Sequence, residues 1–428
     1  MLRSDQLMLH SNPYLKSTPL SHQWGTASFI LKHKYIGDFS EMGTGKSLSA
    51  LTAFAEMKRQ DPLAVMLVVC PPGLANNWRA EIGKHTIFSV ADTFAIDDSD
   101  IYIVSYTKLD KAEALFRLAT FVVADEAHYL KNMDAKRTRF FHALMELYSP
   151  VYFDYATGTP LKNRVPEAYS MLRLWEYGPN LPKISDSYPS FYTFCCRFTN
   201  VRETPFGQKY EGMKNVDELR KYITPFTIRH PASVLALPEL SETDVVVSYN
   251  DDPALAMAFE RFTDKGVGAE ISVKRDSAVA TAKFTAEFIR YALEQGSGPV
   301  VVFSDHIKPL EIMALELSGF KVGIISGETP MAERQPLVDR LNGGKLDVLL
   351  GTFGAMSAGY NLTAANLLVV NDPPWVPGDY EQAKKRIHRK GQERPCRIVR
   401  VIGSKVVETI YRALTGKTKV ITKVLEGT

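Results

Sequence analysis

The chain has 428 residues, of which 45% are apolar, and a formal net charge of +3. This length predicts two or three domains, and the apolar content is sufficient for substantial cores. No uninterrupted apolar segment reaches the roughly 18 to 20 residues that cross a bilayer, and the N-terminus lacks a signal peptide's apolar region. These features exclude a membrane-spanning protein and predict a soluble, cytosolic-type one. The small net charge neither requires nor excludes a polyanionic partner.

The first chemical motif along the chain is Ser40-Glu41-Met42-Gly43-Thr44-Gly45-Lys46-Ser47. Its glycines allow backbone N–H groups to surround phosphate oxygens, Lys46 supplies a positive charge to the outer phosphates, and the Ser47 hydroxyl can bind Mg²⁺. An apolar run around Tyr35 precedes the motif, and residues 48–57 predict a helix whose N-terminus faces the phosphates. Ser40 stands where such loops usually begin with glycine. The motif predicts an ATP-hydrolysing protein.

Short apolar runs alternate with helical patterns in two series, which predicts an α/β fold with parallel sheets covered by helices. The first series of predicted strands comprises residues 65–70, 101–105, 121–124 and 151–156, and the second comprises 300–304, 322–326, 348–351, 367–371 and 398–402. Between the series, residues 165–235 are rich in aromatic residues, proline and glycine. The polar segment 237–243 predicts the crossover from one lobe to the next.

A second chemical element follows the buried run 121–124. Asp125 and Glu126 are placed at the end of a strand, where open α/β sheets present side chains to a ligand. One carboxylate suits Mg²⁺ and the other suits orienting or deprotonating the attacking water. An isolated Asp-Glu pair is usually a solvated loop, but one that follows a phosphate loop by a domain's length is a strong signal. His128 fits either a core or capping residue or a relay of the nucleotide state.

Other features are less specific. The four cysteines, Cys70, Cys195, Cys196 and Cys396, have no metal-binding spacing, which favours buried thiols. Basic residues are concentrated between 384 and 400, although such runs are often solvated faces. The aromatic cluster Phe191, Tyr192, Phe194 and Phe198 fits either a small hydrophobic core or a wedge at a DNA junction, and the core is favoured.

Several motifs in a fixed order resemble the Snf2-like ATPases of helicase superfamily 2, over nearly the whole chain. They are Gly43 to Ser47, Asp125-Glu126-Ala127-His128 with Leu130-Lys131-Asn132, Thr157 to Asn163, Ala358 to Leu362, and Gln382 to Gln392. Further matches are Gln23, Cys70-Pro71-Pro72 with Asn77-Trp78, and Ser326-Gly327-Glu328 with Glu333-Arg334-Gln335. The short central region, with Tyr210-Glu211-Gly212 and Ile228-Arg229-His230, is most similar to the compact annealing-helicase and fork-remodelling branch.

The resemblance implies two RecA-like lobes with ATP between them. Lobe 1 would span residues 1–240 with a helical insertion at about 165–235, and lobe 2 would span 241–428 with a helical segment at about 252–290. The implied catalytic residues are Lys46, Glu126, Arg386 and Arg389, the arginines acting across the cleft. The implied nucleotide-binding residues are Gln23, which reads adenine, Met42, Gly43, Thr44, Gly45, Lys46, Ser47, Asp125 and Gln382. Ser47 and Asp125 would hold Mg²⁺.

The resemblance also places a strand of DNA along both lobes. The implied contacts are Pro71, Pro72, Thr157, Gly158, Thr159, Ser326, Gly327, Thr352 and Asn361, whose hydroxyl and backbone groups meet phosphates without reading bases. Lys162 and Arg164 fit either added phosphate charge or solvated surface.

Three functions are compatible with these residues. The leading one is a DNA-dependent ATPase that translocates on double-stranded DNA and migrates branches or remodels and anneals forks. A second is the displacement of proteins from DNA. A third is an ATP-dependent DNA clamp without productive hydrolysis, which the complete hydrolytic set argues against. We expect a motor that works as a monomer, with ATP and Mg²⁺ as cofactors and DNA as partner, in a bacterial or virus-infected cytoplasm.

Overall fold

The computed structural model describes residues 12–91, 94–161, 164–179, 183–205, 207–247, 269–356 and 359–426. The chain forms two compact units, one comprising Met1–Val234 with Val420–Thr428 and the other comprising Leu235–Lys419. Within the described ranges, none of the helices is long and apolar enough to cross a membrane.

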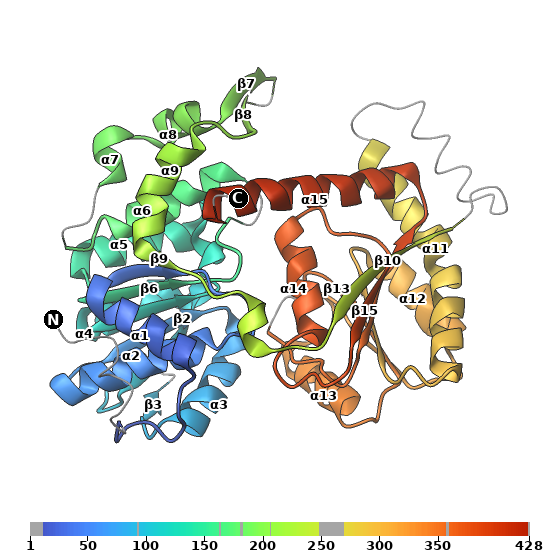
Figure 1. The fold of residues 1–428 in the computed structure, drawn as a ribbon, viewed down its shortest axis with the longest axis horizontal. Helices are drawn as coiled ribbons and strands as arrows, with labels where there is room; N and C mark the ends of the chain where they lie inside the picture. Colours follow the sequence, from blue (N-terminus) through green and yellow to red (C-terminus); the bar gives the residue numbers. More distant parts are fainter. Residues whose placement is uncertain are drawn as a thin grey trace. The chain divides into compact units, whose positions relative to one another are not determined.

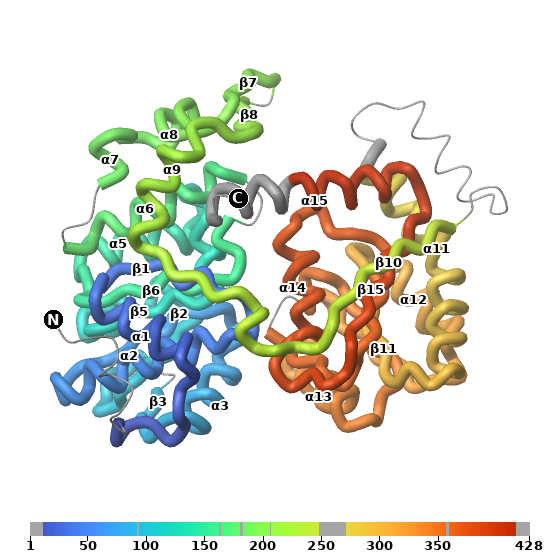
Figure 2. Tube along the Cα trace, in the orientation of Figure 1, coloured from blue at the N-terminus to red at the C-terminus, as the bar shows by residue number. Residues whose placement is uncertain are grey.

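Unit 1 is built on a seven-stranded sheet whose paired strands all run parallel. From one edge to the other, its strands are β3 (Val90–Ala91), β4 (Ile101–Ser105), β2 (Met66–Cys70), β5 (Phe121–Asp125), β6 (Tyr152–Ala156), β1 (Tyr35–Asp38) and β9 (Thr227–Ile228). The four strands predicted in the first series are present, with ends that differ by at most one residue. Figure 2 shows β1, β6 and β5 running together through this unit.

The sheet of unit 1 is buried on both faces, which explains its continuous apolar strands. One face packs against α1 (Ser21–His33), α2 (Lys46–Gln60) and α3 (Ala75–His85) through an apolar layer that includes Ile36, Leu51 and Phe54. The opposite face packs against α4 (Glu113–Leu118), α5 (Lys136–Tyr148) and α6 (Ala168–Trp175) (Figure 1). Alternate residues of each strand therefore enter different cores.

The region between the two series contains helices α7 (Ile184–Ser187), α8 (Phe191–Phe198) and α9 (Val216–Ile223). It also contains an antiparallel hairpin of β7 (Asn200–Thr204) and β8 (Gly207–Glu211), which the prediction of a helical insertion omitted. Phe194 and Phe198 are completely buried, with ring centroids 4.8 Å apart. The small-core interpretation is confirmed for these two rings, whereas Phe191 and Tyr192 are 36% and 49% exposed.

Unit 2 contains a six-stranded sheet that is also parallel throughout. Its order is β10 (Leu240–Val246), β15 (Cys396–Ile402), β14 (Leu367–Val370), β11 (Val300–Ser304), β13 (Val348–Thr352) and β12 (Val322–Ile325). Helices α11 (Ala269–Glu294) and α12 (Ile307–Glu316) cover one face. The other face packs against α13 (Met331–Asn342), α14 (Pro377–Ile387) and α15 (Lys405–Glu426).

The structure corrects the predictions for residues 237–243 and for Cys196. Residues 237–243 were expected to form only a crossover, but Leu240–Val246 forms the edge strand β10 and pairs with β15. The thiols of Cys70, Cys195 and Cys396 are buried as expected, whereas Cys196 is exposed. The predicted helical segment at about 252–290 is present as α11 from Ala269 onward, and its first part lies outside the described residues.

Candidate functional site

The phosphate loop connects β1 to α2 at the carboxyl edge of the sheet in unit 1. Gly43 and Gly45 have φ values of 86° and 88°, which L-residues with side chains rarely adopt. A Cβ atom on Gly45 would lie 2.1 Å from Nε2 of Gln23. The positive φ therefore favours glycine at position 45, next to the first residue of the helix, and a side chain there would displace the amide of Gln23.

Lys46 is the first residue of α2, and its ammonium group lies against its own loop. Its Nζ donates hydrogen bonds to the carbonyl oxygens of Ser40, at 2.9 Å, and Glu41, at 3.5 Å. Ser40, which replaces the usual glycine, donates its backbone N–H to Oδ1 of Asp38 at 2.9 Å, and its hydroxyl accepts the N–H of His230 at 3.1 Å. Ser40 therefore fastens the start of the loop to two neighbouring segments.

Gln23, predicted to read adenine, reaches the loop from α1. Its Nε2 donates to the carbonyl oxygen of Thr44 at 3.1 Å, while its Oε1 accepts the N–H of Leu20 at 2.8 Å. The ring of His22 contacts the same Thr44 carbonyl at 2.8 Å. These bonds place the Gln23 side chain directly beside the glycine turn. A role in adenine recognition stays a prediction.

Asp125 ends β5 and presents a carboxylate held by two donors. The indole N–H of Trp78 donates to Oδ2 at 2.8 Å, and the backbone N–H of Glu126 donates to Oδ1 at 2.9 Å. Burial, followed by the neighbouring Glu126 carboxylate, raises the pKa of Asp125 to about 6. The carboxylate and the half-buried Ser47 hydroxyl are hard oxygen donors of the kind that Mg²⁺ prefers, so the residues fit the predicted ion.

His128 links the second acidic residue to the loop after β6. Its Nδ1 lies 3.2 Å from Oε2 of Glu126, 3.2 Å from the hydroxyl of Thr157 and 3.4 Å from that of Thr159. Glu126 itself has a left-handed backbone, with φ 50° and ψ 46°. The imidazole is buried, as the core interpretation required. A role as a relay of the nucleotide state stays a prediction.

The loop after β6 also contacts the phosphate loop. A Cβ on Gly158 would lie 3.2 Å from Cγ of Met42 and 3.4 Å from the backbone nitrogen of Met42. The hydroxyl of Thr157 accepts the N–H of Thr159 at 3.1 Å, which gives this loop a compact turn. Unit 1 thus brings together Met42, Lys46, Asp125, Glu126 and Thr157 at one edge of its sheet.

In unit 2, the predicted nucleotide-facing residues belong to α14 and the turn after it. Gln382 and Arg386 are 4% and 3% exposed, and the backbone carbonyl of Arg386 accepts the N–H of Leu362 at 3.0 Å. Arg389 is half-buried, and its Nη1 donates to the carbonyl oxygen of Tyr360 at 3.4 Å. The structure therefore connects this turn to the segment around Tyr360 and Leu362.

The predicted DNA contacts lie at strand ends in both units. Pro71 and Pro72 follow β2, and Thr157, Gly158 and Thr159 follow β6. In unit 2, Ser326 and Gly327 follow β12, Thr352 ends β13, and Asn361 is exposed in the segment before β14. Lys162 and Asn163 lie outside the described residues, whereas Arg164 is exposed. Their contact with DNA stays a prediction.

The basic segment from 384 to 400 is partly neutralised by acidic residues. Lys384 pairs with Glu242 at 2.8 Å and with Glu381 at 2.7 Å. Arg400 pairs with Asp244 at 2.5 Å and lies 3.6 Å from Glu242. Glu242 and Asp244 belong to β10 and lie outside the basic segment in sequence, but they neutralise part of its charge. The count of basic residues between 384 and 400 therefore overstates the net positive charge at this place.

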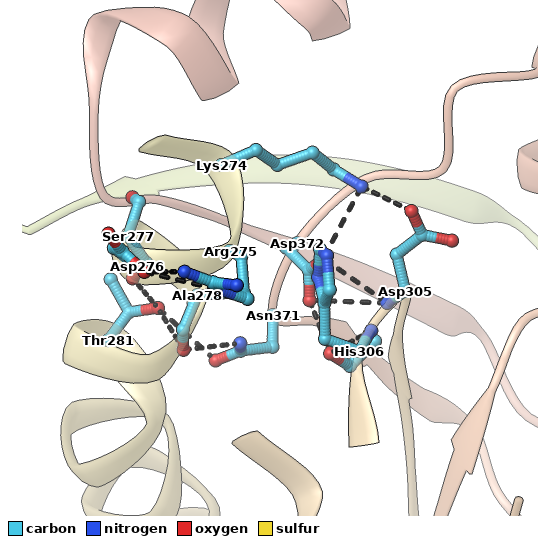
Figure 3. Close-up of polar contacts among 11 residues, drawn as sticks. Lys274, Arg275, Asp276, Ser277, Ala278, Thr281, Asp305, His306, Asn371 and Asp372 are labelled. Atoms are coloured by element: carbon cyan, nitrogen blue, oxygen red, sulfur yellow. Dashed lines mark hydrogen bonds and ion pairs between the residues drawn. The ribbon is translucent and has the colours of Figure 1, made fainter. Parts of the chain in front are cut away.

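Sequence reasoning missed a second polar cluster, at the carboxyl ends of β11 and β14 in unit 2 (Figure 3). Asp372 is completely buried, and it accepts hydrogen bonds from the Ser304 hydroxyl and from the backbone N–H of Asp305. The Nδ1 atom of His306 lies 3.0 Å from Oδ2 of Asp372. The strand-end argument used for Asp125 applies equally to Asp305 and Asp372, so the signal was present in the sequence.

A lysine from α11 completes this cluster. Lys274 is completely buried, contacts the carboxylate of Asp305, and lies 3.6 Å from Oδ2 of Asp372. Although Asp305, His306 and Asp372 are close enough to hold a metal ion, the Lys274 ammonium already supplies the positive charge that these carboxylates require. The cluster therefore anchors α11 to the sheet of unit 2.

Family comparisons match both units. Residues 39–252 match the SNF2-related domain, and residues 283–391 match the helicase conserved C-terminal domain. The SWI/SNF-related matrix-associated actin-dependent regulator of chromatin subfamily A-like protein 1 of Drosophila melanogaster is 27% identical over 415 residues, covering 90% of this chain and 53% of the relative. The DNA annealing helicase and endonuclease ZRANB3 of Bos taurus is 24% identical over 426 residues, covering 90% and 38%.

The chain thus spans about half the length, or less, of these curated relatives. Among solved structures, the Sulfolobus solfataricus SWI2/SNF2 ATPase core in complex with dsDNA is 22% identical. That similarity covers 98% of this chain and 99% of the other, with a TM-score of 0.46.

The anchor in unit 2 leads to a stability prediction. Lys274→Met leaves the buried Asp372 without its cation, so we expect unit 2 to lose about 3–5 kcal/mol of unfolding free energy, measured by urea denaturation. Lys283→Met is the matched control, because Lys283 lies on the same helix but is 75% exposed, and it should change stability by less than about 0.5 kcal/mol. Equal effects of the two substitutions would contradict the anchoring role.

Proposed function

The chain belongs to the SNF2-related family and is an ATP hydrolase of the helicase superfamily, and we propose that it is a motor that translocates on double-stranded DNA. Its proposed task is branch migration or the remodelling and annealing of forks in replication, recombination or repair. The names of its relatives support this choice, since one is a DNA annealing helicase.

The observation that carries the proposal is the set of contacts in unit 1 by which the loop after β6 adjoins both the phosphate loop and the acidic strand end. Gly158 lies against Met42, and His128 contacts both Glu126 and Thr157. A change at the phosphates is proposed to reach the residues predicted to meet DNA through these contacts. A DNA clamp that never hydrolysed ATP would not need a connection between this loop and Glu126, the residue proposed below as the catalytic base.

Nucleotide binding is assigned to the start of α2. The backbone N–H groups of residues 43–47 and the helix dipole favour phosphate at this position. Lys46 would exchange its bonds to the Ser40 and Glu41 carbonyls for bonds to phosphate oxygens. Ser47 and Asp125 would hold Mg²⁺, which when bound neutralises charge on the phosphates and orients them for displacement.

Glu126 is proposed as the base that orients and deprotonates the attacking water. Its carboxylate is kept close to Nδ1 of His128, at 3.2 Å, so its position depends on the same imidazole that contacts Thr157. Movement of the Thr157 loop on DNA would therefore alter the position of the base. This arrangement gives a physical reason for hydrolysis to depend on DNA.

Arg386 and Arg389 of unit 2 are proposed to supply positive charge to the phosphates that unit 1 holds. An arginine that meets transition-state charge in a desolvated site contributes on the order of 10³ to 10⁵ in rate. Gln382 is proposed as a nucleotide contact from the same helix. The monomeric state and the bacterial or virus-infected cytoplasm remain predictions from the sequence.

The assignment of the base predicts a separation of binding from turnover. Glu126→Gln keeps the shape of the side chain but removes the base, so we expect near-normal ATP binding and a loss of about 10²- to 10⁴-fold in turnover. Lys46→Ala should instead weaken binding itself. The exposed Glu113→Gln serves as control. Single-turnover hydrolysis and nucleotide-binding measurements distinguish these outcomes, and normal turnover by Glu126→Gln would exclude it as the base.

The role of unit 2 predicts that Arg389→Ala retains DNA binding and loses hydrolysis by about 10³-fold or more. Arg389→Lys should remain impaired, because an ammonium lacks the planar, forked donors of a guanidinium. Lys390→Ala is the neighbouring control, since Lys390 is exposed. Steady-state kinetics of all three variants provide the test, and wild-type rates for Arg389→Ala would refute the arginine assignment.

The substrate is tested by ATP hydrolysis at fixed salt without nucleic acid and with single-stranded DNA, linear duplex, a fork, a four-way junction or RNA. We expect strong stimulation by duplex and greater stimulation by branched DNA, with affinity falling steeply as salt rises because phosphate contacts release counterions. Stimulation by single strands or RNA alone would indicate a conventional helicase. No hydrolysis under any condition would support the clamp.

A further inference from the structure

Two aspartates are completely buried in the sheet of unit 1, and none of the roles above uses them. Asp38 is the last residue of β1, and Asp154 lies in the middle of β6. The register pairs Ile36 with Asp154 and Asp38 with Ala156. Because side chains alternate along strands, Asp38 and Asp154 point to the same face of the sheet, which is the face covered by α2.

Their hydrogen bonding is unequal. Oδ1 of Asp38 accepts the backbone N–H of Ser40 at 2.9 Å. Among the residues that the structure describes, neither carboxyl oxygen of Asp154 has a hydrogen-bond partner of normal geometry. An ionised carboxylate without partners is unstable in an apolar core, so such a group retains its proton. Oδ2 of Asp38 also lacks a partner among these residues, so Asp38 has one hydrogen-bond donor and Asp154 has none.

The electrostatic surroundings agree with this division. Burial, and after it the carboxylate of Asp38, raises the pKa of Asp154 well above its ordinary value of 3.8. Asp125 of β5 acts in the same direction, while Lys46 at the start of α2 and the Asp38 backbone N–H act against it. Burial lowers the pKa of the neighbouring His230; the carboxylate of Asp38 opposes this shift and His22 adds to it.

We propose that Asp154 is a buried neutral acid that, with Asp38, limits the charge beneath the phosphate loop to a single negative charge. This inference rests on the proposed nucleotide site, for which Asp154 acts as a positioning residue through Lys46. The Lys46 ammonium attracts negative charge at Asp154. A second negative charge in the sheet would therefore hold the lysine there and repel the phosphates that are proposed to bind at the start of α2.

The protonation of Asp154 can be tested without any nucleotide, through the pH dependence of the protein's stability. Above pH 3.8 the unfolded chain loses this proton while the native protein keeps it, so native stability falls as pH rises. One such proton lowers the folding equilibrium constant by up to about tenfold per pH unit. Asp125, with a pKa of about 6, contributes mainly below that value. Burial lowers the pKa of His142 to about 4, so this group adds a slope of opposite sign up to about pH 7. The difference in slope between wild type and an Asp154 variant therefore isolates Asp154.

We therefore expect the stability of Asp154→Asn to lack this slope relative to wild type, while the exposed Asp98→Asn retains it. Denaturant unfolding followed by tryptophan fluorescence suits this test, because three of the four tryptophans, Trp24, Trp78 and Trp175, belong to unit 1. Infrared spectroscopy of the wild type should show a protonated carboxylic acid at pH 7 to 8. Its absence, or equal slopes for wild type and Asp154→Asn, would overturn the proposal even if Asp154→Asn folds poorly.

The consequence for nucleotide binding is tested by two substitutions of the same chemistry. Asp38→Asn removes a charge, so it should change ATP affinity by about three- to tenfold. Asp154→Asn replaces a neutral acid by a neutral amide, so the ATP affinity of this variant should stay close to that of the wild type. Equal changes in both variants would overturn the charge division. If the wild-type protein fails to bind ATP but shows the infrared signal of a protonated acid, the proposed nucleotide site is contradicted, whereas the protonation of Asp154 is still supported.

Discussion

The parallel pairing of β6 with both β1 and β5 is the constraint on which the site in unit 1 depends. Ala156, the last residue of β6, is paired with Asp38 on one side and with Asp125 on the other. This register fixes the phosphate loop, the acidic strand end and the Thr157 loop at one edge of the sheet. A shift of one residue would move the side chains of β6 to the opposite face.

The phosphate loop and the Thr157 loop adjoin one another at this edge of the sheet in unit 1. The phosphate loop is held by hydrogen bonds from Gln23 to Thr44 and from Ser40 to Asp38. The neighbouring Thr157 loop is tied to it through Gly158 and to the acidic strand end through His128. A ligand that displaces one loop must therefore displace groups beside the others, which is the property that a nucleotide-driven motor requires.

The sequence predicted the strands well where both faces are buried, because such strands are continuous apolar runs. β10 was missed because it is an edge strand with mostly exposed, polar residues, whose pattern resembles a linker. The elements of the phosphate site were predictable from spacing, but their partners were not. Trp78, for example, is 47 residues from the Asp125 carboxylate it contacts, and only the fold brings them together.

Buried charge was the least predictable feature. Asp154 lies within an apolar run, and a strand assignment tolerates one aspartate without indicating where its side chain points. Lys274 was equally obscure, because its partners Asp305 and Asp372 come from other elements. Periodicity identifies which residues enter a core, but it does not show how a charge there is compensated.

The two units compensate their buried acids differently, and the difference has a physical reason. In unit 2, a lysine neutralises Asp372 and fixes α11 to the sheet. In unit 1, a second lysine beside Asp154 would place a permanent positive charge beneath the phosphates that are proposed to bind there. Such a charge would bind nucleotide tightly in every state, whereas a motor must release its product. A proton removes the excess charge of Asp154 without adding a fixed cation, so the affinity of the loop remains set by Lys46 and the helix terminus.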